Sequence, residues 1–393
     1  MSKNEVQYVL GNKENSKCSL PVYSDIVCGF LDALSKELRC DAEAKKYPDV
    51  ITFAFWCRRS NIEQLKKNYE QRYPRVGRGC VFHVAPSNVP INFAFSLAFG
   101  LLAGNSNVVR VSEKQFPQVD IVSQAMKHVL DREEFVCLKQ YITVVSYGHD
   151  KVINDNYSKG CDVRVIWGGD ATIQEMRESP LPPRSTEITF ADRYSFAILD
   201  EETIEMNTGE QVLALAEKFY NDTYLMDQNA CSSPHFIMWQ PSKEKKGRIR
   251  FWEQLGKVAE RYELPAIKTI DKYTMCCEVA TNQEDTVHVQ TYGNQLYVVT
   301  MKKIPENIER LRGKFGLFYE CDSRKLDEVI KGMSNKIQTC VTYGMDKMKI
   351  AQAVIKNGSQ GIDRIVEVGD AMSIGVDWDG YDVISSLSRE IIV

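Results

Sequence analysis

Short apolar runs alternate with helix-like segments between residues 79 and 178, and this alternation constrains the fold more than any other feature of the chain. The runs lie at 79–85, 107–111, 141–145 and 162–167. Strands that alternate with helices form a parallel sheet covered by helices on both faces. The sequence therefore predicts an α/β fold, in which ligands bind beyond the carboxyl ends of the strands.

Apolar residues at helical spacing mark the segments between these runs. We expect helices at 25–38, 61–69, 91–103, 116–130, 151–159 and 171–178. The alternation of strands and helices continues after residue 190, with strands at 195–199, 236–239 and 295–301 and helices at 211–220, 248–262 and 326–334. A chain of 393 residues is too long for one small core. We therefore expect a second α/β unit, with the boundary in the polar, acidic segment 200–209.

A net charge of −4 argues against a nucleic-acid partner, because proteins that bind polyanions carry a basic excess. The basic run 243–250 is interpreted as a solvated loop and helix start, with a phosphate site as the alternative. The longest apolar stretch, 93–103, is far shorter than the roughly 20 residues of a membrane helix. We therefore expect no membrane span.

Twelve cysteines and a polar N-terminus without an apolar leader predict a reducing compartment, the cytoplasm. The cysteine spacing is irregular and includes no CxxC pair, and the adjacent Cys276 and Cys277 have no matching histidines. We therefore expect no zinc or other metal site.

One cysteine, Cys231, lies in a loop of polar and small residues directly before the apolar run 235–239. A thiol buried in an apolar core is inert, whereas a thiol on a polar turn can ionise and attack a carbonyl carbon. Cys231 is therefore a candidate nucleophile. The alternative is a structural cysteine.

Several segments together carry a family resemblance. They are HVAPSNVPINFAFSLAFGLLAGNSNVVRVS, DVRVIWGGDATIQEMR, FADRYS, DQNACSSP and DRIVEVGDAMSIGVDWDGYDVISSLSR. In these segments the chain resembles the fatty-acyl-CoA reductase (LuxC) family of the aldehyde dehydrogenase superfamily. The resemblance implies two Rossmann-type parallel-sheet domains with the active site in the interdomain cleft. We expect a cofactor-binding domain at 1–203, a catalytic domain at 204–370, and a C-terminal tail at 371–393 that is a candidate interface.

The resemblance assigns the acyl chemistry to two residues. Cys231 would displace the leaving thiol of an acyl thioester and hold the acyl group until a hydride reduces it. Asn88, in the turn PSNVP, would donate a hydrogen bond to the oxyanion, together with the backbone N–H of the nucleophile. The alternative for Asn88 is an asparagine selected by turn geometry.

The resemblance also assigns a cofactor site. Ser87 adjoins Asn88, and Arg110, Ser112 and Glu113 follow a predicted strand, where relatives carry a lysine-x-small-glutamate pattern that meets the adenosine ribose. The arginine offers a planar fork that suits the 2′-phosphate of NADPH. Glu113 favours NADH, because a carboxylate there binds a free 2′-hydroxyl. We expect NADPH as the cofactor, with NADH as the alternative. The structural alternative is that Arg110 and Glu113 form a surface salt bridge and bind no cofactor.

Gly168 and Gly169 end a predicted strand and precede a helix, with Asp170 as the expected N-cap. The backbone amides of such a turn can face a pyrophosphate, because helix N-termini favour anions. Ordinary loop chemistry is the alternative interpretation of these glycines.

Hydrolytic aldehyde dehydrogenases carry a general-base glutamate where the resemblance places Phe190. An acyl-enzyme without such a base should hydrolyse slowly, which favours a reductase over an oxidase. Glu187, three residues earlier, is the alternative base.

Of four further residues, we expect two to have structural roles, and the sequence does not decide the roles of the other two. His235 lies four residues after Cys231, but we expect the strand to direct it elsewhere. His83 is expected to be a satisfied core histidine. Trp378 and Tyr381 form a lid, an interface turn or a cap on the core.

Together these features predict NADPH-dependent reduction of an acyl thioester, carried on coenzyme A or on a partner protein, to an aldehyde. The resemblance also implies an acyl-protein synthetase partner and a homo-oligomer. The alternatives are a CoA-acylating aldehyde dehydrogenase that works in the oxidative direction and a non-catalytic scaffold with the same fold.

Overall fold

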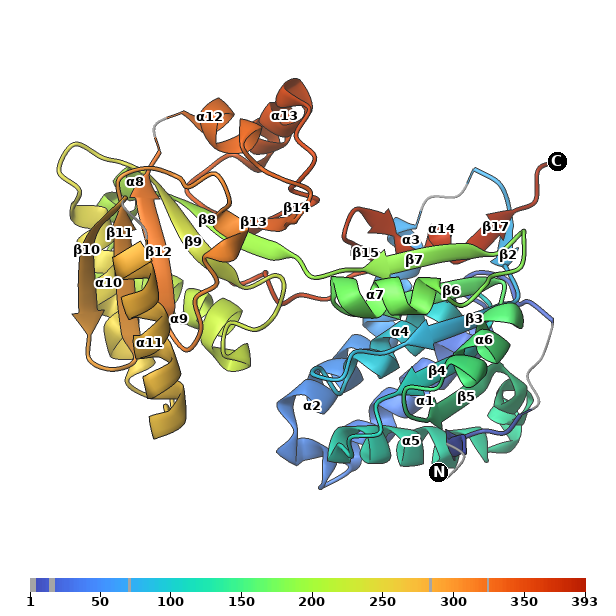
Figure 1. Ribbon diagram of the computed structural model, residues 1–393. Helices are drawn as coiled ribbons and strands as arrows, with labels where there is room; N and C mark the ends of the chain where they lie inside the picture. The colour runs from blue at the N-terminus through green and yellow to red at the C-terminus, as the bar shows by residue number, and fades with distance from the viewer. Residues whose placement is uncertain (1–4, 14–17, 70–71, 283–284, 324) are drawn as a thin grey trace. The chain divides into compact units, whose positions relative to one another are not determined.

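The computed structural model describes residues 5–13, 18–69, 72–282, 285–323 and 325–393. In it the chain forms two compact units (Figure 1). The first unit comprises the chain up to Ala191 together with Tyr381–Val393, and the second unit is Asp192–Gly380.

These bounds differ from the division that we expected at residues 203 and 370. The strand β8 (Tyr194–Asp200) explains the difference at the first boundary, because it lies inside the second sheet between β9 (Pro234–Gln240) and β13 (Ile337–Tyr343). The last residues of the chain return to the first unit, where β17 (Ser388–Glu390) pairs antiparallel with β2 (Arg75–Gly77).

The sheet of the first unit has the order β1-β5-β4-β3-β6-β7. All neighbouring strands are parallel except β1, which is antiparallel to β5. The strands are β1 (Gln7–Leu10), β3 (Cys80–Val84), β4 (Ser106–Val111), β5 (Ile142–Ser146), β6 (Val163–Trp167) and β7 (Thr186–Phe190). Val84 is paired with Arg110 on one side and Ile166 on the other, so the carboxyl ends of the central strands share one edge.

Helices pack on this sheet, and α4 (Asn92–Leu102) is the most deeply buried of them, because ten of its eleven residues are buried. Capping fixes some of the helix starts. The side chain of Asp150, for example, accepts hydrogen bonds from the backbone of Val152 and Ile153 at the start of α6. The helices are α1 (Asp25–Cys40), η1 (Ala44–Lys46), α2 (Pro48–Trp56), α3 (Arg59–Asn68), α4 (Asn92–Leu102), α5 (Pro117–Leu130), η2 (Glu133–Tyr141), α6 (Lys151–Lys159), α7 (Asp170–Arg177) and α14 (Val383–Ser386).

The sheet of the second unit has the order β10-β11-β12-β9-β8-β13-β14. It is parallel except for the antiparallel edge strand β10. Besides β8, β9 and β13, its strands are β10 (Thr286–Tyr292), β11 (Leu296–Met301), β12 (Leu317–Asp322) and β14 (Arg364–Glu367). The short strands β15 (Asp377–Trp378) and β16 (Tyr381–Asp382) flank the turn through which the chain leaves this unit.

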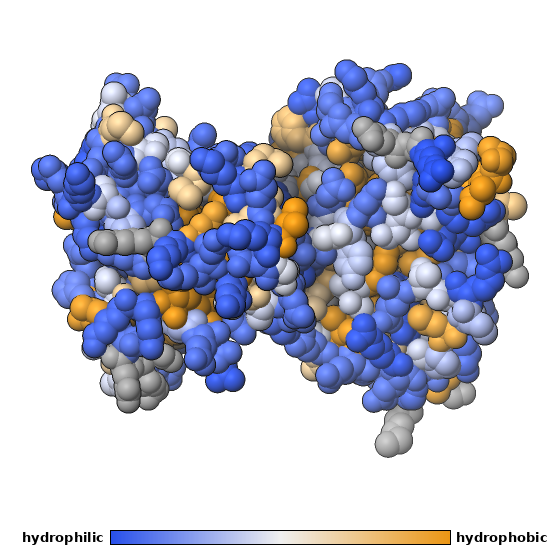
Figure 2. Space-filling view, turned by 90° about the horizontal axis from the view of Figure 1, so that it is seen from above, coloured by the Kyte–Doolittle hydropathy of each residue, from blue (hydrophilic) through white to orange (hydrophobic). Residues whose placement is uncertain are grey.

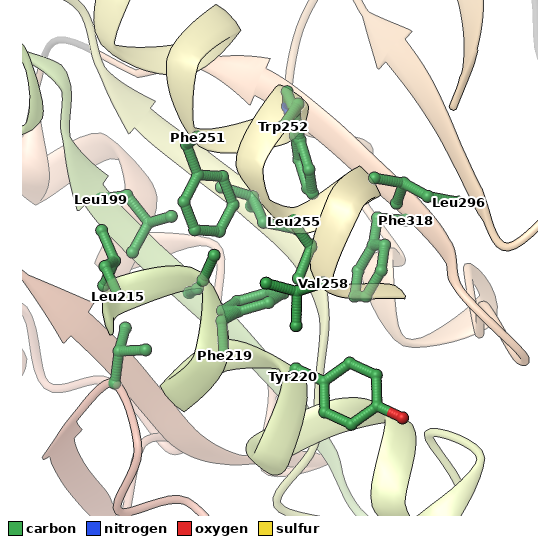
Figure 3. Close-up of a cluster of buried hydrophobic side chains, with 14 of the residues drawn as sticks. Leu199, Leu215, Phe219, Tyr220, Phe251, Trp252, Leu255, Val258, Leu296 and Phe318 are labelled. Atoms are coloured by element: carbon green, nitrogen blue, oxygen red, sulfur yellow. The ribbon is translucent and has the colours of Figure 1, made fainter. Parts of the chain in front are cut away.

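The helices of the second unit include two that build its main core, α9 and α10. Their apolar faces meet in a cluster that contains Phe219, Trp252 and Phe318 (Figure 3). A capping box between Thr208 and Gln211 starts α9. The helices are α8 (Glu201–Met206), α9 (Gly209–Thr223), η3 (Tyr224–Met226), α10 (Lys246–Ala259), α11 (Ala266–Asn282), η4 (Ile308–Arg310), α12 (Leu326–Lys331) and α13 (Lys347–Asn357).

The expected α/β architecture is confirmed, and most predicted elements lie within a few residues of the observed ones. Several elements were missed, among them α2, β7, β12 and β13. In β13 the residues Gln338, Thr339 and Thr342 are polar although all three are buried. The strand therefore lacks the apolar run that would indicate a central position.

On the face seen in Figure 2, hydrophilic residues predominate and hydrophobic residues gather in small patches. None of the helices in the described part of the chain is both long and apolar enough to cross a membrane.

Candidate active site

A pocket of about 480 Å³ lies at the carboxyl edge of the first sheet. This volume is within the range of small-molecule sites. All seven candidate residues of the first unit line it: Ser87, Asn88, Arg110, Ser112, Glu113, Gly168 and Gly169. The structure therefore brings these residues together. Their roles in binding remain predictions.

Ser87 and Asn88 occupy the turn between β3 and α4. Both are exposed, whereas the strand before them and the helix after them are buried. The prolines Pro86 and Pro90 flank the pair and restrict the backbone of the turn. The turn thus presents an amide side chain at the pocket from a rigid support.

Arg110 reaches the pocket from the end of β4. Its Nη2 donates hydrogen bonds to the carbonyl oxygens of Tyr147 and Gly148 at 3.4 and 3.3 Å, and its guanidinium lies 4.7 Å from the centre of the Tyr147 ring. Its buried Nε has no acceptor among the described residues. The guanidinium is therefore oriented by carbonyl groups that leave its positive charge available to a bound anion.

The next residues along the chain complete this side of the pocket. The Oγ of Ser112 accepts a hydrogen bond from the backbone N–H of Lys114 at 3.1 Å, which fixes the turn after β4. Glu113 is exposed at the pocket. The pocket thus holds a cation and a carboxylate on neighbouring positions, as the sequence predicts.

Gly168 and Gly169 form the turn from β6 into α7. Gly169, and not Asp170 as expected, is the N-cap, and Asp170 is the first helical residue. A Cβ atom at Gly168 would lie 3.1 Å from Thr172, whereas a Cβ atom at Gly169 would meet nothing within 4 Å. The backbone of Gly169 is extended (φ −67°, ψ 166°), a conformation open to any residue. Neither backbone geometry nor protein packing explains the glycine at 169.

Among the pocket residues that the sequence did not predict, four have side chains with an aromatic ring or a hydroxyl group that a ligand could contact. These are Tyr147, His149, Trp167 and Thr172. The signal was available for the first three, because each ends or follows a strand of the same parallel sheet, where ligand sites form.

Cys231 lies in the second unit, in the turn before β9, and is half-buried. Ser195, from β8, donates a hydrogen bond from its Oγ to the Cys231 carbonyl oxygen at 2.6 Å and accepts one from the backbone of Thr339 at 3.2 Å. Two neighbouring strands thereby fix the backbone of the candidate nucleophile.

The loop before Cys231 contains two successive residues in the left-handed conformation, Asp227 (φ 54°) and Gln228 (φ 57°). Such a conformation costs about 1 kcal/mol or more in a residue other than glycine. Hydrogen bonds offset this: Asp227 accepts from Lys268 at 2.8 Å, and the Gln228 amide bonds to the backbone of Leu317 and Gly316. The loop is thus held in an unusual shape by side chains that pack against it.

Burial raises the pKa of the Cys231 thiol above its ordinary value, and a hydrogen bond from the backbone N–H of Arg193 opposes this shift. The net effect is a protonated thiol at neutral pH in the unliganded protein. To act as a nucleophile, the thiol would first have to lose this proton.

His235 is not the group that would take the proton from the Cys231 thiol. Its Nδ1 lies 2.9 Å from the carbonyl oxygen of Gly313, and its ring stacks on Tyr194. Burial lowers the pKa of His235 to about 3. The histidine is a neutral core residue, which confirms the structural interpretation.

Neither Phe190, at the position of the hydrolytic base, nor Glu187, the alternative base, is suited to activate water. Phe190 is buried and stacks on Trp167, with ring centres 3.7 Å apart. Glu187 is held by Arg164 at 2.8 Å and by Arg177 at 2.8 Å. Both oxygens of this carboxylate are thus already bonded to arginines, so the group is not free to bind an attacking water.

The basic run 243–250 and the aromatic residues Trp378 and Tyr381 all have partners in the structure. The basic run 243–250 is paired with acids: Lys245 and Arg248 both bind Asp322, and Arg248 also binds Glu201 at 2.9 Å. The run lies in the loop before α10 and in the first residues of this helix, as the interpretation as a loop and helix start predicts. Trp378 lies under the guanidinium of Arg364 at 5.2 Å, and Tyr381 meets the edge of Phe190 at 5.9 Å.

Solved aldehyde dehydrogenases share this architecture. Lactaldehyde dehydrogenase from Escherichia coli matches 100% of this chain and 96% of its own with a TM-score of 0.65 at 12% identity. A NAD-dependent benzaldehyde dehydrogenase from Corynebacterium glutamicum matches 93% of this chain and 84% of its own with a TM-score of 0.60 at 12% identity. The chain therefore has the aldehyde dehydrogenase fold.

The family is defined by sequence. The model of the acyl-CoA reductase (LuxC) family matches residues 49–390, and the chain belongs to this family. A curated relative, the long-chain acyl-protein thioester reductase of Vibrio harveyi, is 24% identical over 195 residues. The match covers 49% of this chain and 38% of that protein, so the chain spans well under half of the relative's length.

Proposed function

We propose that this protein reduces an acyl thioester to an aldehyde, with NADPH as the reductant and Cys231 as the acyl carrier. The observation that carries the proposal is the half-buried thiol of Cys231 on a backbone fixed by Ser195, in a chain of the acyl-CoA reductase family. The acyl donor is an acyl-CoA or an acyl group on a partner protein; the relative from Vibrio harveyi is named for the latter.

The pocket of the first unit fits a dinucleotide phosphate. Among the described residues the buried Nε of Arg110 has no acceptor, and a Cβ atom at Gly169 would meet nothing within 4 Å, so the pocket offers a cationic group and open space for phosphates. Relatives of the same fold include a NAD-dependent enzyme and a dehydrogenase solved in complex with NAP. When bound, the reduced cofactor supplies the hydride. Arg110 would hold a 2′-phosphate, and the α7 start at Gly169 would hold the pyrophosphate.

The residues of the chain then carry out one acyl transfer and the release of the reduced product. The Cys231 sulfur, after losing its proton, bonds to the thioester carbonyl carbon; the bond to the donor sulfur breaks, and the released thiolate takes up a proton. The Asn88 amide and the backbone N–H of Cys231 would stabilise the oxyanion. Once the acyl carbon has gained a hydride, the bond to the Cys231 sulfur breaks and an aldehyde leaves.

The lack of a suitable base at Phe190 and Glu187 supports reduction over hydrolysis. Water attack on the acyl-cysteine needs a group that removes its proton, and Glu187 is neutralised by two arginines. The acyl-cysteine should therefore persist until it is reduced. A CoA-acylating dehydrogenase would use the same residues in reverse, and the same assay run with aldehyde, NADP⁺ and free coenzyme A measures that direction.

The test is acyl-CoA-dependent oxidation of NADPH with the aldehyde identified as product. Cys231→Ala should abolish turnover without loss of folded protein, whereas Cys277→Ala, which removes an exposed cysteine of the same unit, should leave turnover unchanged. Undiminished turnover in Cys231→Ala would reassign the nucleophile. A folded wild-type chain that turns over no acyl-CoA or acyl-protein in either direction would favour the scaffold.

A further inference from the structure

A buried chain of hydrogen bonds runs beneath the pocket and ends on Trp167. The Trp167 Nε1 lies 2.8 Å from the Oγ of Ser96, which lies 2.7 Å from the Nδ1 of His83. The Nε2 of His83 lies 3.0 Å from the Oδ1 of Asn107. The side chains come from β6, α4, β3 and β4, so four elements of the first unit meet in one network.

The donor and acceptor roles in this chain follow from its two ends. The indole N–H of Trp167 can only donate, so Ser96 accepts from it and gives its own proton to His83 Nδ1. At the other end, the Asn107 amide nitrogen donates to the carbonyl oxygens of Asn105 and Tyr141, so Asn107 Oδ1 accepts from His83 Nε2–H. Every member is satisfied, and His83 is neutral.

Burial supports the same protonation state. His83 is fully buried, and this lowers its pKa to about 4. The network therefore persists at neutral pH. A fully satisfied buried polar network fixes one arrangement of its side chains, whereas apolar packing alone permits several.

Gly100 shows that α4 makes room for this network. A Cβ atom at this position would lie 1.9 Å from the Asn107 Oδ1 and 3.0 Å from the His83 Nε2. Glycine in a helix interior is less favourable than alanine by about 1 kcal/mol. The helix thus carries a destabilising residue at the point where a larger one would break the bond between His83 and Asn107.

Of the four hydrogen-bonded side chains in this network, Trp167 is the only one that lines the pocket formed by the described residues. One side of its indole stacks on Phe190, with ring centres 3.7 Å apart and planes at 15°. The N–H is fixed by Ser96, so the ring is held from two directions. It adjoins Gly168 and Gly169, on the other side of β3 from Arg110.

We propose that Trp167 contacts the bound cofactor at the end of the pocket remote from Arg110, and that the chain Asn107–His83–Ser96 positions its ring for this contact. The inference rests on the proposed nicotinamide cofactor. Trp167 is the contacting residue, and Ser96 and His83 are positioning residues that act through it.

A double-mutant cycle tests this arrangement. The variants are Ser96→Ala, Trp167→Phe and the double variant, and the readouts are the dissociation constants of NADPH and NADH and the near-ultraviolet circular dichroism. The matched control is Ser123→Ala, which removes the hydroxyl of another buried serine of the first unit, one without a hydrogen-bond partner in the described structure.

We expect Ser96→Ala and Trp167→Phe each to weaken dinucleotide binding on the order of three- to tenfold, the equivalent of one hydrogen bond. In the Trp167→Phe background, Ser96→Ala should cause no further loss, because Ser96 acts through the indole. Ser123→Ala should match the wild type. Trp167→Phe keeps an aromatic ring on Phe190, so it tests the contact even if Ser96→Ala fails to fold.

Three outcomes would overturn the proposal. They are wild-type affinity in Trp167→Phe, wild-type affinity in a folded Ser96→Ala, and losses that multiply in the double variant. A folded wild-type protein that binds neither dinucleotide would instead refute the proposed cofactor site, and this inference with it. The wild-type titration alone therefore distinguishes the two failures.

Discussion

Replacing Gly169 by alanine separates a ligand-binding role of this glycine from a structural one. Its φ of −67° and ψ of 166° suit alanine, and a Cβ atom there would meet nothing within 4 Å. Alanine is a poorer N-cap than glycine, which costs about 0.5–1 kcal/mol, while the loss of chain entropy in the unfolded state returns about 0.4–1 kcal/mol. We therefore expect the melting temperature to change little.

Cofactor binding should respond differently. A methyl group on the N-cap would stand where a pyrophosphate approaches the first N–H groups of α7. Loss of one charge-assisted hydrogen bond is worth about 1.5–3 kcal/mol, which corresponds to a roughly 10- to 150-fold weaker dissociation constant. Gly209→Ala is the matched control, because Gly209 also lies at a helix start with nothing within 4 Å of its Cβ position.

The assay is thermal unfolding of each variant followed by titration with NADPH and NADH. Gly169→Ala should retain the wild-type melting temperature and lose affinity, and Gly209→Ala should retain both. If Gly169→Ala binds both dinucleotides as tightly as the wild type, the pyrophosphate does not lie on the start of α7. A large drop in its melting temperature would show instead that the glycine has a structural role.

Three further predictions concern single residues. Arg110→Ala should weaken NADPH roughly 10- to 150-fold, by loss of a charge-assisted bond, and NADH much less; equal losses in the two titrations would refute the phosphate contact. Asn88→Ala should slow acyl transfer roughly 10²- to 10³-fold in a single-turnover assay, and an unchanged rate, with acylation shown to be rate-limiting, would count against the oxyanion role. Alkylation of Cys231 by iodoacetamide should keep accelerating as the pH rises past about 8.5, the ordinary thiol value, because burial raises its pKa. A rate that levels off below about pH 8 would contradict this.

The sequence predicted which residues meet at the pocket of the first unit, because parallel sheets place the carboxyl ends of their strands at one edge. Ser87 and Gly168 each follow a strand and Arg110 lies at the end of one, so their grouping follows from topology alone. The contacts of Arg110 could not be predicted in the same way. Its guanidinium bonds to the backbone of Tyr147 and Gly148, and only the register of β4 against β5 brings these carbonyl groups to it.

The same limit applies to Cys231. Its polar loop is visible in the sequence, but its pKa depends on burial and on the backbone of Arg193, and its position depends on Ser195, 36 residues earlier in the chain. The missed strand β13 has the same cause. Its buried Gln338 donates a hydrogen bond to Asp379, and the backbone N–H of Thr339 donates one to Ser195, so contacts distant in sequence hold this strand and local hydropathy does not indicate it.

The most direct test of the proposed chemistry is the intact mass of the protein after exposure to acyl-CoAs of varied chain length without NADPH. We expect the mass of one acyl group on the wild type and on Cys277→Ala, none on Cys231→Ala, and loss of the added mass when NADPH is supplied. Acylation that persists in Cys231→Ala, or a wild-type protein that takes up no acyl group from either acyl-CoA of any chain length or acyl-protein, would contradict the role of this thiol.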